Sequence, residues 1–298
     1  EVSTWKFEVW NEPEIAIFWG ASKEEYFNFY KETVQTIKSI SNKLEVGGPS
    51  ITHQALKDGK WLEEFITYCL ENQVPIDFVT LHIYSESFSA YPDYTKNEKD
   101  GEIEKGDNQE ENKVEINNII NLYFCNLNNI YYDENHTRDT IKDGQERIRE
   151  SFGTELPLHI TEWNATSFGR NYISDTCFIA SFLAKNILQA IDTVESMGYW
   201  TSTDIMEEFK AGISPFHGGF GLINQNGIKK PSYYSYLFLS KLGNEIIAKE
   251  EDYIVTKKGE NFQILVYDFT YFDDVFLKGD ISALTYKDRY KVYQIKEE

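Results

Sequence analysis

Hydrophobic positions along the first 250 residues follow two spacings that alternate. Short apolar runs, typical of buried strands, are separated by longer segments in which apolar residues recur every three or four positions, as on one face of a helix. The runs predict strands at residues 5–10, 44–49, 77–84, 156–162 and 197–201. The longer segments predict helices at residues 23–40, 60–71, 115–132, 140–152, 176–193 and 233–242. Ser22, followed three residues later by Glu25, predicts a capping box at the start of the first helix.

The alternation of strand and helix is typical of a parallel α/β sheet, in which helices cover strands that are apolar throughout. Polar residues gather just after the predicted strands, and the C-terminal strand ends are where a (β/α)₈ TIM barrel builds its active site. These polar positions are Asn11 with Glu12, Gly47 with Gly48, His82 with Tyr84, Glu162 with Asn164, and residues 204–208. We therefore predict an α/β fold of the TIM-barrel type.

The predicted units are too few for a closed barrel. Five strand-helix units are three short of eight, and because the whole fold takes about 250 residues, we expect roughly 120–150 residues to be missing before Glu1. The chain is then a C-terminal fragment with strands four to eight, and we assign residues 1–245 to this partial catalytic barrel. Open strand edges would favour self-association of such a fragment if it folds alone.

Two segments depart from the barrel pattern. Residues 85–113 lose the periodicity and are rich in charge, which predicts a long acidic loop inserted into the barrel. After Glu250 the apolar positions come in short alternating segments at residues 252–259, 261–269 and 289–295, which predict a small antiparallel β appendage. We assign this appendage, part of a β-sandwich, to residues 246–298.

Composition and charge narrow the class of partner. The 298 residues are 41% hydrophobic and 15% aromatic, enough for a large core. The formal net charge of −20 disfavours nucleic acid and anionic membranes as partners and favours a neutral substrate. The chain contains no apolar run of 18 residues. The three cysteines lack the spacing of a metal site, which predicts reduced thiols in a cytoplasmic protein.

Two glutamates occur in matched contexts, Glu12 in WKFEVWNEP and Glu162 in LPLHITEWN. A single glutamate at a strand end more often forms a salt bridge or caps a helix, but a matched pair is more specific. Retaining glycosidases use two carboxyl groups about 5–5.5 Å apart, one as a proton donor and one as a nucleophile. Hydrogen-bond donors must keep the nucleophile ionised, and donors at the predicted strand ends are Asn11, His82, Tyr84 and Asn164.

The neighbouring residues also have purely structural interpretations. His82 could be a hydrogen-bonded imidazole of the core, and Trp200 a packing residue of the barrel wall. Glu207 and Glu208 could be a solvated acidic pair. The residues alone leave these alternatives open.

The motifs WNEP, LHIY, HITEWN, YWTSTDIMEE and FHGGFGL together resemble glycoside hydrolase family 39, the group of retaining β-xylosidases and α-L-iduronidases. The resemblance implies a β-xylosidase-like hydrolase of xylo-oligosaccharides or related neutral glycans, with no metal or cofactor. It implies Glu12 as general acid/base and Glu162 as nucleophile. The residues implied for sugar binding are Asn11, His82, Tyr84, Trp200, Glu207, Glu208 and His217. An iduronidase is disfavoured, because no basic residue lies at a predicted strand end.

The C-terminal segment is short for the β-sandwich of that family. It resembles the xylosidase-like domain behind the DNA-binding helices of some AraC-type bacterial regulators. A DNA-binding domain would then lie in the missing N-terminal region, and this chain itself would not bind nucleic acid. Three functions stay open: a glycosidase, a sugar sensor with little or no turnover, and a binding scaffold. The carboxylates favour the glycosidase, because a sensor has no need for a buried ionisable pair.

Overall fold

The computed structural model describes residues 4–88, 130–132, 135–167, 171–206 and 214–269. The chain forms two compact units, the first made of Glu1–Tyr84 with Asn135–Phe269 and the second of Ser85–Glu134 with Thr270–Glu298. None of the described helices is long and apolar enough to cross a membrane.

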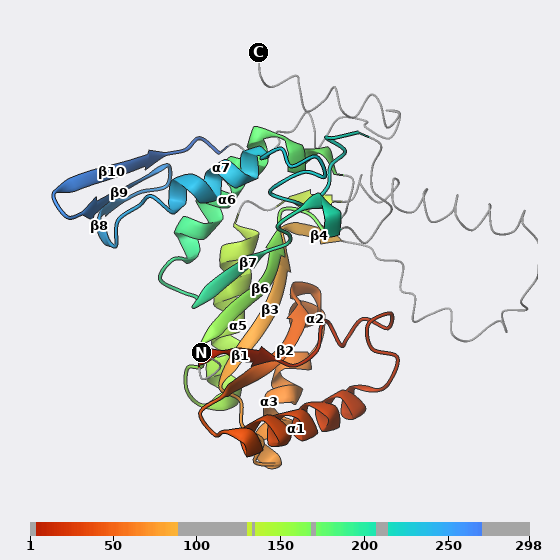
Figure 1. Ribbon diagram of the computed structural model, residues 1–298. Coiled ribbons are helices and arrows are strands. Elements are labelled where there is room, and N and C mark those ends of the chain that lie inside the picture. Colours follow the sequence, from red (N-terminus) through yellow and green to blue (C-terminus); the bar gives the residue numbers. More distant parts are fainter. Residues whose placement is uncertain (1–3, 89–129, 133–134, 168–170, 207–213, 270–298) are drawn as a thin grey trace, which may run out of the picture. The chain divides into compact units, whose positions relative to one another are not determined.

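The first unit contains a five-stranded sheet in the order β1-β2-β3-β6-β7 (Figure 1). All neighbouring strands are parallel, as predicted, and their bounds differ from the predicted ones by a few residues. The strands are β1 (Lys6–Glu8), β2 (Glu45–Thr52), β3 (Phe78–Tyr84), β6 (Leu158–Asn164) and β7 (Ser196–Tyr199). The sheet therefore brings the C-terminal ends of strands from distant parts of the chain to one edge.

Helices follow the strands and contact one another in the same order. They are α1 (Lys23–Ile40), α2 (His53–Asp58), α3 (Trp61–Glu71), α5 (His136–Phe152), α6 (Cys177–Ala190) and α7 (Pro231–Leu239), with 3-10 turns η4 (Tyr172–Asp175) and η5 (Asp204–Met206). Successive contacts run from α1 to α3, α5, α6 and α7. Helix α1 begins at the predicted capping box, in which Ser22 and Glu25 bond each other's backbone N–H groups. The six-residue helix α2 was not predicted.

The core lies between the sheet and the helices. Tyr30 of α1 packs edge to face on Phe65 of α3, with ring centroids 4.7 Å apart, and Val46 and Leu81 of the strands are fully buried. Burial of each such side chain contributes about 1.5–3 kcal/mol. This packing fixes the strands from one side, so that the site at their ends has a rigid support.

The sheet is curved, as in the wall of a barrel. The hydroxyl of Thr161 on β6 donates to Oε1 of Glu8 on β1 at 2.7 Å, although β2 and β3 lie between these two strands in the sheet. A flat sheet would hold β1 and β6 roughly three strand spacings apart, about 14 Å. The curvature thus lets side chains of non-neighbouring strands meet on the face away from the helices.

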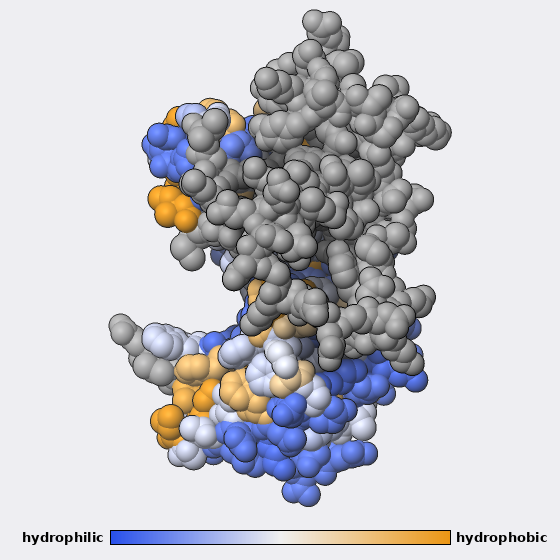
Figure 2. All heavy atoms as spheres, turned by 90° about the vertical axis from the view of Figure 1, so that its right-hand side faces the viewer, coloured by the Kyte–Doolittle hydropathy of each residue, from blue (hydrophilic) through white to orange (hydrophobic). Residues whose placement is uncertain are grey.

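Hydrophobic surface lies near the β1 edge. In Figure 2, hydrophobic side chains gather at the lower left, at the height of α1 and of the loop before it. Exposed residues of these segments include Ile17, Phe18 and Phe29. The indoles of Trp10 and Trp19 pack edge to face beside them, with ring centroids 5.4 Å apart. This surface borders an end strand that no described strand covers.

A second, antiparallel sheet follows α7 in the first unit. It has the order β10-β9-β8 and consists of β8 (Glu245–Lys249), β9 (Tyr253–Lys258) and β10 (Asn261–Val266). Strands β9 and β10 agree with the antiparallel segments predicted after Glu250, whereas β8 was not predicted. The last of these predicted segments, residues 289–295, lies outside the described residues.

The second unit is described only in part, and two expectations for it need correction. Glu86–Phe88 (β4) pairs antiparallel with Ile130–Tyr132 (β5), so the predicted acidic loop of residues 85–113 begins with a strand. Residues 130–132, predicted as a helix end, are also strand, because Ile-Tyr-Tyr favours a ladder when a partner is available. The remainder of both predicted segments lies outside the described residues.

Candidate active site

Glu12 lies in the loop that follows β1, and its side chain points into the protein. The residue is 7% exposed and has a left-handed backbone with φ of +43°. Its N–H donates to the carbonyl of Ser50 at 3.0 Å, and Glu14 Oε1 accepts from the N–H of Thr52 at 2.7 Å. Two hydrogen bonds to the end of β2 therefore hold the loop in place.

Glu162 lies on β6, with 13% of its side chain exposed. The hydroxyl of Tyr84, at the end of the neighbouring strand β3, donates to its Oε1. This hydrogen bond fixes the orientation of the carboxyl group.

His82 joins the two carboxylates. Its Nδ1 lies 2.7 Å from Glu12 Oε1 and 3.5 Å from Glu162 Oε2. A register shift between β3 and β6 after Leu81 places His82 directly beside Glu162. One oxygen of each glutamate and one ring nitrogen of His82 all lie within 4.8 Å of one another.

The surroundings of His82 raise its pKa above the ordinary value. Burial, at 2% exposure, acts to lower the pKa, but the hydrogen bond to Glu12 and the negative charges of Glu162, Glu12 and Glu8 together outweigh it. The imidazolium form therefore persists to higher pH than in water. A positive charge at this position offsets part of the repulsion between the two carboxylates.

The spacing of these three side chains alone would also suit a metal ion. The Nδ1 atom that would bind it, however, is already within hydrogen-bonding distance of Glu12. The arrangement favours proton sharing between imidazole and carboxylate, which is the chemistry of an acid/base site.

The other residues expected to bind sugar are placed less completely. Asn11 is exposed beside Glu12, and Trp200 follows β7, where its carbonyl accepts a hydrogen bond from Asn164 Nδ2 at 2.6 Å. His217 is buried, and its Nδ1 lies 2.8 Å from the carbonyl of Ser214. The structure thus brings Glu12, His82, Tyr84 and Glu162 together. It links Trp200 to the end of β6 through the hydrogen bond from Asn164. Glu207 and Glu208 lie outside the described residues.

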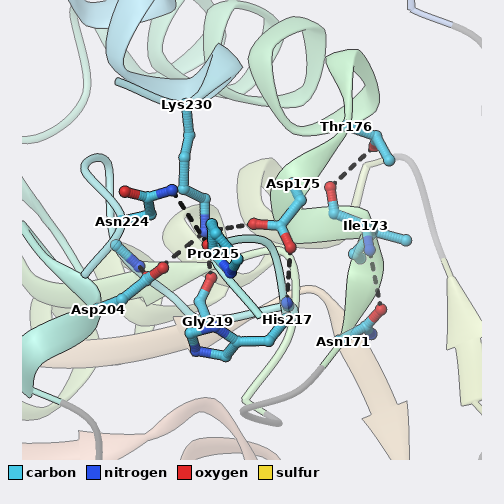
Figure 3. A network of polar contacts seen from close by, with 12 residues as sticks. Asn171, Ile173, Asp175, Thr176, Asp204, Pro215, His217, Gly219, Asn224 and Lys230 are labelled. Atoms are coloured by element: carbon cyan, nitrogen blue, oxygen red, sulfur yellow. Dashed lines mark hydrogen bonds and ion pairs between the residues drawn. The ribbon is translucent and has the colours of Figure 1, made fainter. Parts of the chain in front are cut away.

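A buried lysine that no sequence pattern indicated supports the segment that carries His217. Lys230, 0% exposed, has its Nζ 2.7 Å from Asp175 Oδ1, 3.4 Å from Asp204 Oδ1 and 2.6 Å from the carbonyl of Gly219. Asp175 in turn accepts from the N–H of Gly218 at 2.6 Å. Figure 3 shows Asp175 of η4, Asp204 of η5 and Gly219 of the loop before α7 around Lys230, which immediately precedes α7. The network fixes the backbone next to His217.

Comparison with known proteins places the chain in a family. The model of "Glycosyl hydrolases family 39" matches residues 1–146 and 128–259. The chain is similar to a beta-xylosidase of Geobacillus stearothermophilus, with 33% identity over 259 residues that cover 87% of this chain and 45% of the relative. The crystal structure of a monomeric beta-xylosidase from Caulobacter crescentus CB15 is also similar, with a TM-score of 0.73, 28% identity, and coverage of 92% of this chain and 49% of that chain.

A shorter similarity links the chain to regulators. An uncharacterized HTH-type transcriptional regulator of Staphylococcus aureus is 30% identical over 118 residues, which cover 39% of this chain and 16% of the regulator. The resemblances to the glycosidase family and to regulators are therefore both confirmed. The chain spans about half the length of the beta-xylosidases that it matches. Because the family model matches most of the length of this chain, the chain belongs to glycosyl hydrolase family 39.

Proposed function

We propose that this chain carries the two catalytic carboxylates of a retaining, β-xylosidase-like glycoside hydrolase. The observation that supports it most is the approach of oxygens of Glu12 and Glu162 to within 4.8 Å. A retaining enzyme separates its carboxyl groups by about 5–5.5 Å, whereas an inverting enzyme needs about 6.5–9.5 Å to admit a water molecule. The short separation favours double displacement.

In the first step Glu162 attacks the anomeric carbon of the sugar and forms an ester while the glycosidic C–O bond breaks. Glu12 gives the departing oxygen the proton that it shares with Nδ1 of His82. The hydrogen bond from Tyr84 holds the attacking carboxylate in place. His82, with its raised pKa, places positive charge beside both carboxylates.

In the second step a water molecule replaces the departed alcohol. Glu12, now ionised, takes a proton from this water, which attacks the anomeric carbon and releases the sugar from Glu162. Two inversions restore the original configuration. Both carboxylates return to their starting protonation states without an external reagent.

The substrate is a short, neutral xylose-containing oligosaccharide. The name of the similar relatives and the net charge of −20 support this class. In this proposal Asn11 contacts the sugar 2-hydroxyl and Trp200 forms an apolar wall of the sugar site. His217 shapes the rim of the site, and Glu207 and Glu208 accept hydrogen bonds from sugar hydroxyls.

The parallel strands correspond to strands four to eight of a TIM barrel. Residues 1–245 form the barrel part, and residues 246–298 form the appendage.

A second candidate is a sugar-sensing domain of a regulator. The similarity to an HTH-type transcriptional regulator over 118 residues favours it. The same site would then bind a glycan with little or no turnover.

A panel of aryl glycosides separates the two functions. We expect release of the aryl group from the β-xyloside faster than from the β-glucoside or the α-arabinoside, and proton NMR should detect β-xylose as the first product. Binding of xylobiose in calorimetry without release from any aryl glycoside would favour the sensor. Formation of α-xylose first would contradict the retaining mechanism.

A further inference from the structure

Ser50 interrupts the pairing of β2 with β3. The ladder pairs Pro49 with Thr80 and then Ile51 with Leu81, which leaves Ser50 as an extra residue in a β-bulge. The residue is fully buried and has a left-handed backbone with φ of +59°. Its N–H leaves the ladder and donates to the Thr80 hydroxyl at 2.9 Å. Bulges beside active sites commonly redirect a side chain.

Both remaining polar groups of Ser50 point to the candidate site. Its hydroxyl oxygen lies 2.9 Å from Nε2 of His82. Its carbonyl accepts the hydrogen bond from the N–H of Glu12. The other ring nitrogen of His82 faces Glu12 and Glu162. Ser50 therefore contacts both the loop that carries Glu12 and the imidazole of His82, and fixes their positions relative to each other.

We propose that Ser50 is a positioning residue, whose hydroxyl holds Nε2 of His82 so that Nδ1 faces the two carboxylates. Its effect on turnover rests on the proposed function, whereas the orientation of His82 is a property of the folded chain alone. A hydroxyl suits this position because it donates to a neutral Nε2 and accepts from the N–H of an imidazolium. Ser50 therefore supports His82 in both protonation states.

Loss of the hydroxyl would affect the two states unequally. Hydrogen bonds to charged groups are stronger than those to neutral ones, so the imidazolium loses more stabilisation than the neutral ring. The charged groups that face His82, which are Glu12, Glu162 and Glu8, stay in place. Removal of the Ser50 hydroxyl should therefore lower the pKa of His82.

The direct experiment is nitrogen-15 NMR of the histidine rings over a pH series, with the His82 signals assigned by comparison with His82→Gln. We expect the neutral ring of the wild-type chain to carry its proton on Nδ1. In Ser50→Ala the titration should move to lower pH. Ser50→Gly, whose backbone readily accepts a positive φ, should show the same shift if Ser50→Ala folds poorly. The matched control is Ser235→Ala, which removes a buried hydroxyl that donates to the Ala180 carbonyl.

An Nε2–H tautomer in the neutral wild-type ring, or an unchanged His82 titration in the Ser50 variants, would overturn the proposal. If the protein hydrolyses aryl xylosides, the Ser50 variants should lower kcat about tenfold, which corresponds to one charge-assisted hydrogen bond, with KM nearly unchanged. Wild-type protein that lacks turnover but shows the expected ring signals would contradict the glycosidase function and leave the role of Ser50 supported.

Discussion

The Tyr84 hydroxyl donates a hydrogen bond to Glu162 Oε1, although the two residues are 78 positions apart. They meet because β3 and β6 are neighbours, with a register that sets Tyr84 beside Asn164 and His82 beside Glu162. His82 and Tyr84 of β3 thus both lie beside the Glu162 carboxylate, since side chains i and i+2 of a strand lie on the same face. The sheet register, rather than any single loop, assembles this half of the site.

Tyr84→Phe should lower kcat/KM about 10–100-fold, because the ionised Glu162 loses one charge-assisted hydrogen bond while the ring stays in place. Initial rates on an aryl β-xyloside measure the effect. Tyr68→Phe is a matched control, since the Tyr68 hydroxyl donates to Asn28 on the surface of the helices. Equal rates for wild type and Tyr84→Phe would show that this hydrogen bond does not assist the nucleophile.

Replacement of Glu162 and replacement of Glu12 should reduce hydrolytic activity in different ways, depending on the leaving group of the substrate. Glu162→Ala should lose activity on all substrates, because no group remains to attack the sugar. Glu12→Ala should retain activity on aryl xylosides with good leaving groups, which need no protonation, and lose it on xylobiose. Glu14→Gln, which keeps the acceptor for the Thr52 N–H, is the control for changes in this loop. Unchanged rates in both alanine variants would exclude the proposed roles.

The raised pKa of His82 should appear as a pH dependence of stability. Because the folded pKa lies above the unfolded value of about 6.5, the imidazolium stabilises the folded state fully below pH 6.5. This contribution is lost as pH rises through the folded pKa. Urea unfolding of wild type and His82→Gln between pH 5.5 and 8.5 isolates it as the difference in unfolding free energy. That difference should shrink with rising pH, and a constant difference would contradict the raised pKa.

Lys230→Met should lower the free energy of unfolding by about 3–5 kcal/mol, because it leaves the buried carboxylates of Asp175 and Asp204 without their cation. Urea unfolding measures this change. Lys229→Met is the neighbouring control, since Lys229 is exposed and lies over the Tyr233 ring. A loss as small as that of the control would mean that the buried network adds little stability.

Much of the fold could be predicted from the chain because periodicity and caps are local signals. Helix α1 was predicted with its observed bounds, since Ser22 and Glu25 mark its start. Helix α2 was missed because its six residues follow β2 without a break and are too few to show a helical period. The β5 strand was mistaken for a helix end, because its pairing with β4 depends on a partner about 44 positions away.

The site shows the same division between local and non-local information. The matched contexts of Glu12 and Glu162 could be read from the chain, but their approach within 4.8 Å depends on the curvature of the sheet. Ser50 could not be predicted, because its role arises from a one-residue bulge in the pairing of β2 with β3. Lys230 could not be predicted either, since lysine is normally exposed and its partners come from separate segments.

The most direct test of the proposed mechanism is to trap the sugar on the protein. A 2-deoxy-2-fluoroxyloside with a good leaving group slows hydrolysis of the glycosyl ester more than it prevents its formation, so the ester accumulates. Intact-mass and peptide-mapping mass spectrometry should find one fluoroxylosyl group per chain, attached to Glu162 and absent from Glu162→Ala. A label on another residue, or no label on protein that hydrolyses the parent xyloside, would contradict the assignment of Glu162 as the nucleophile.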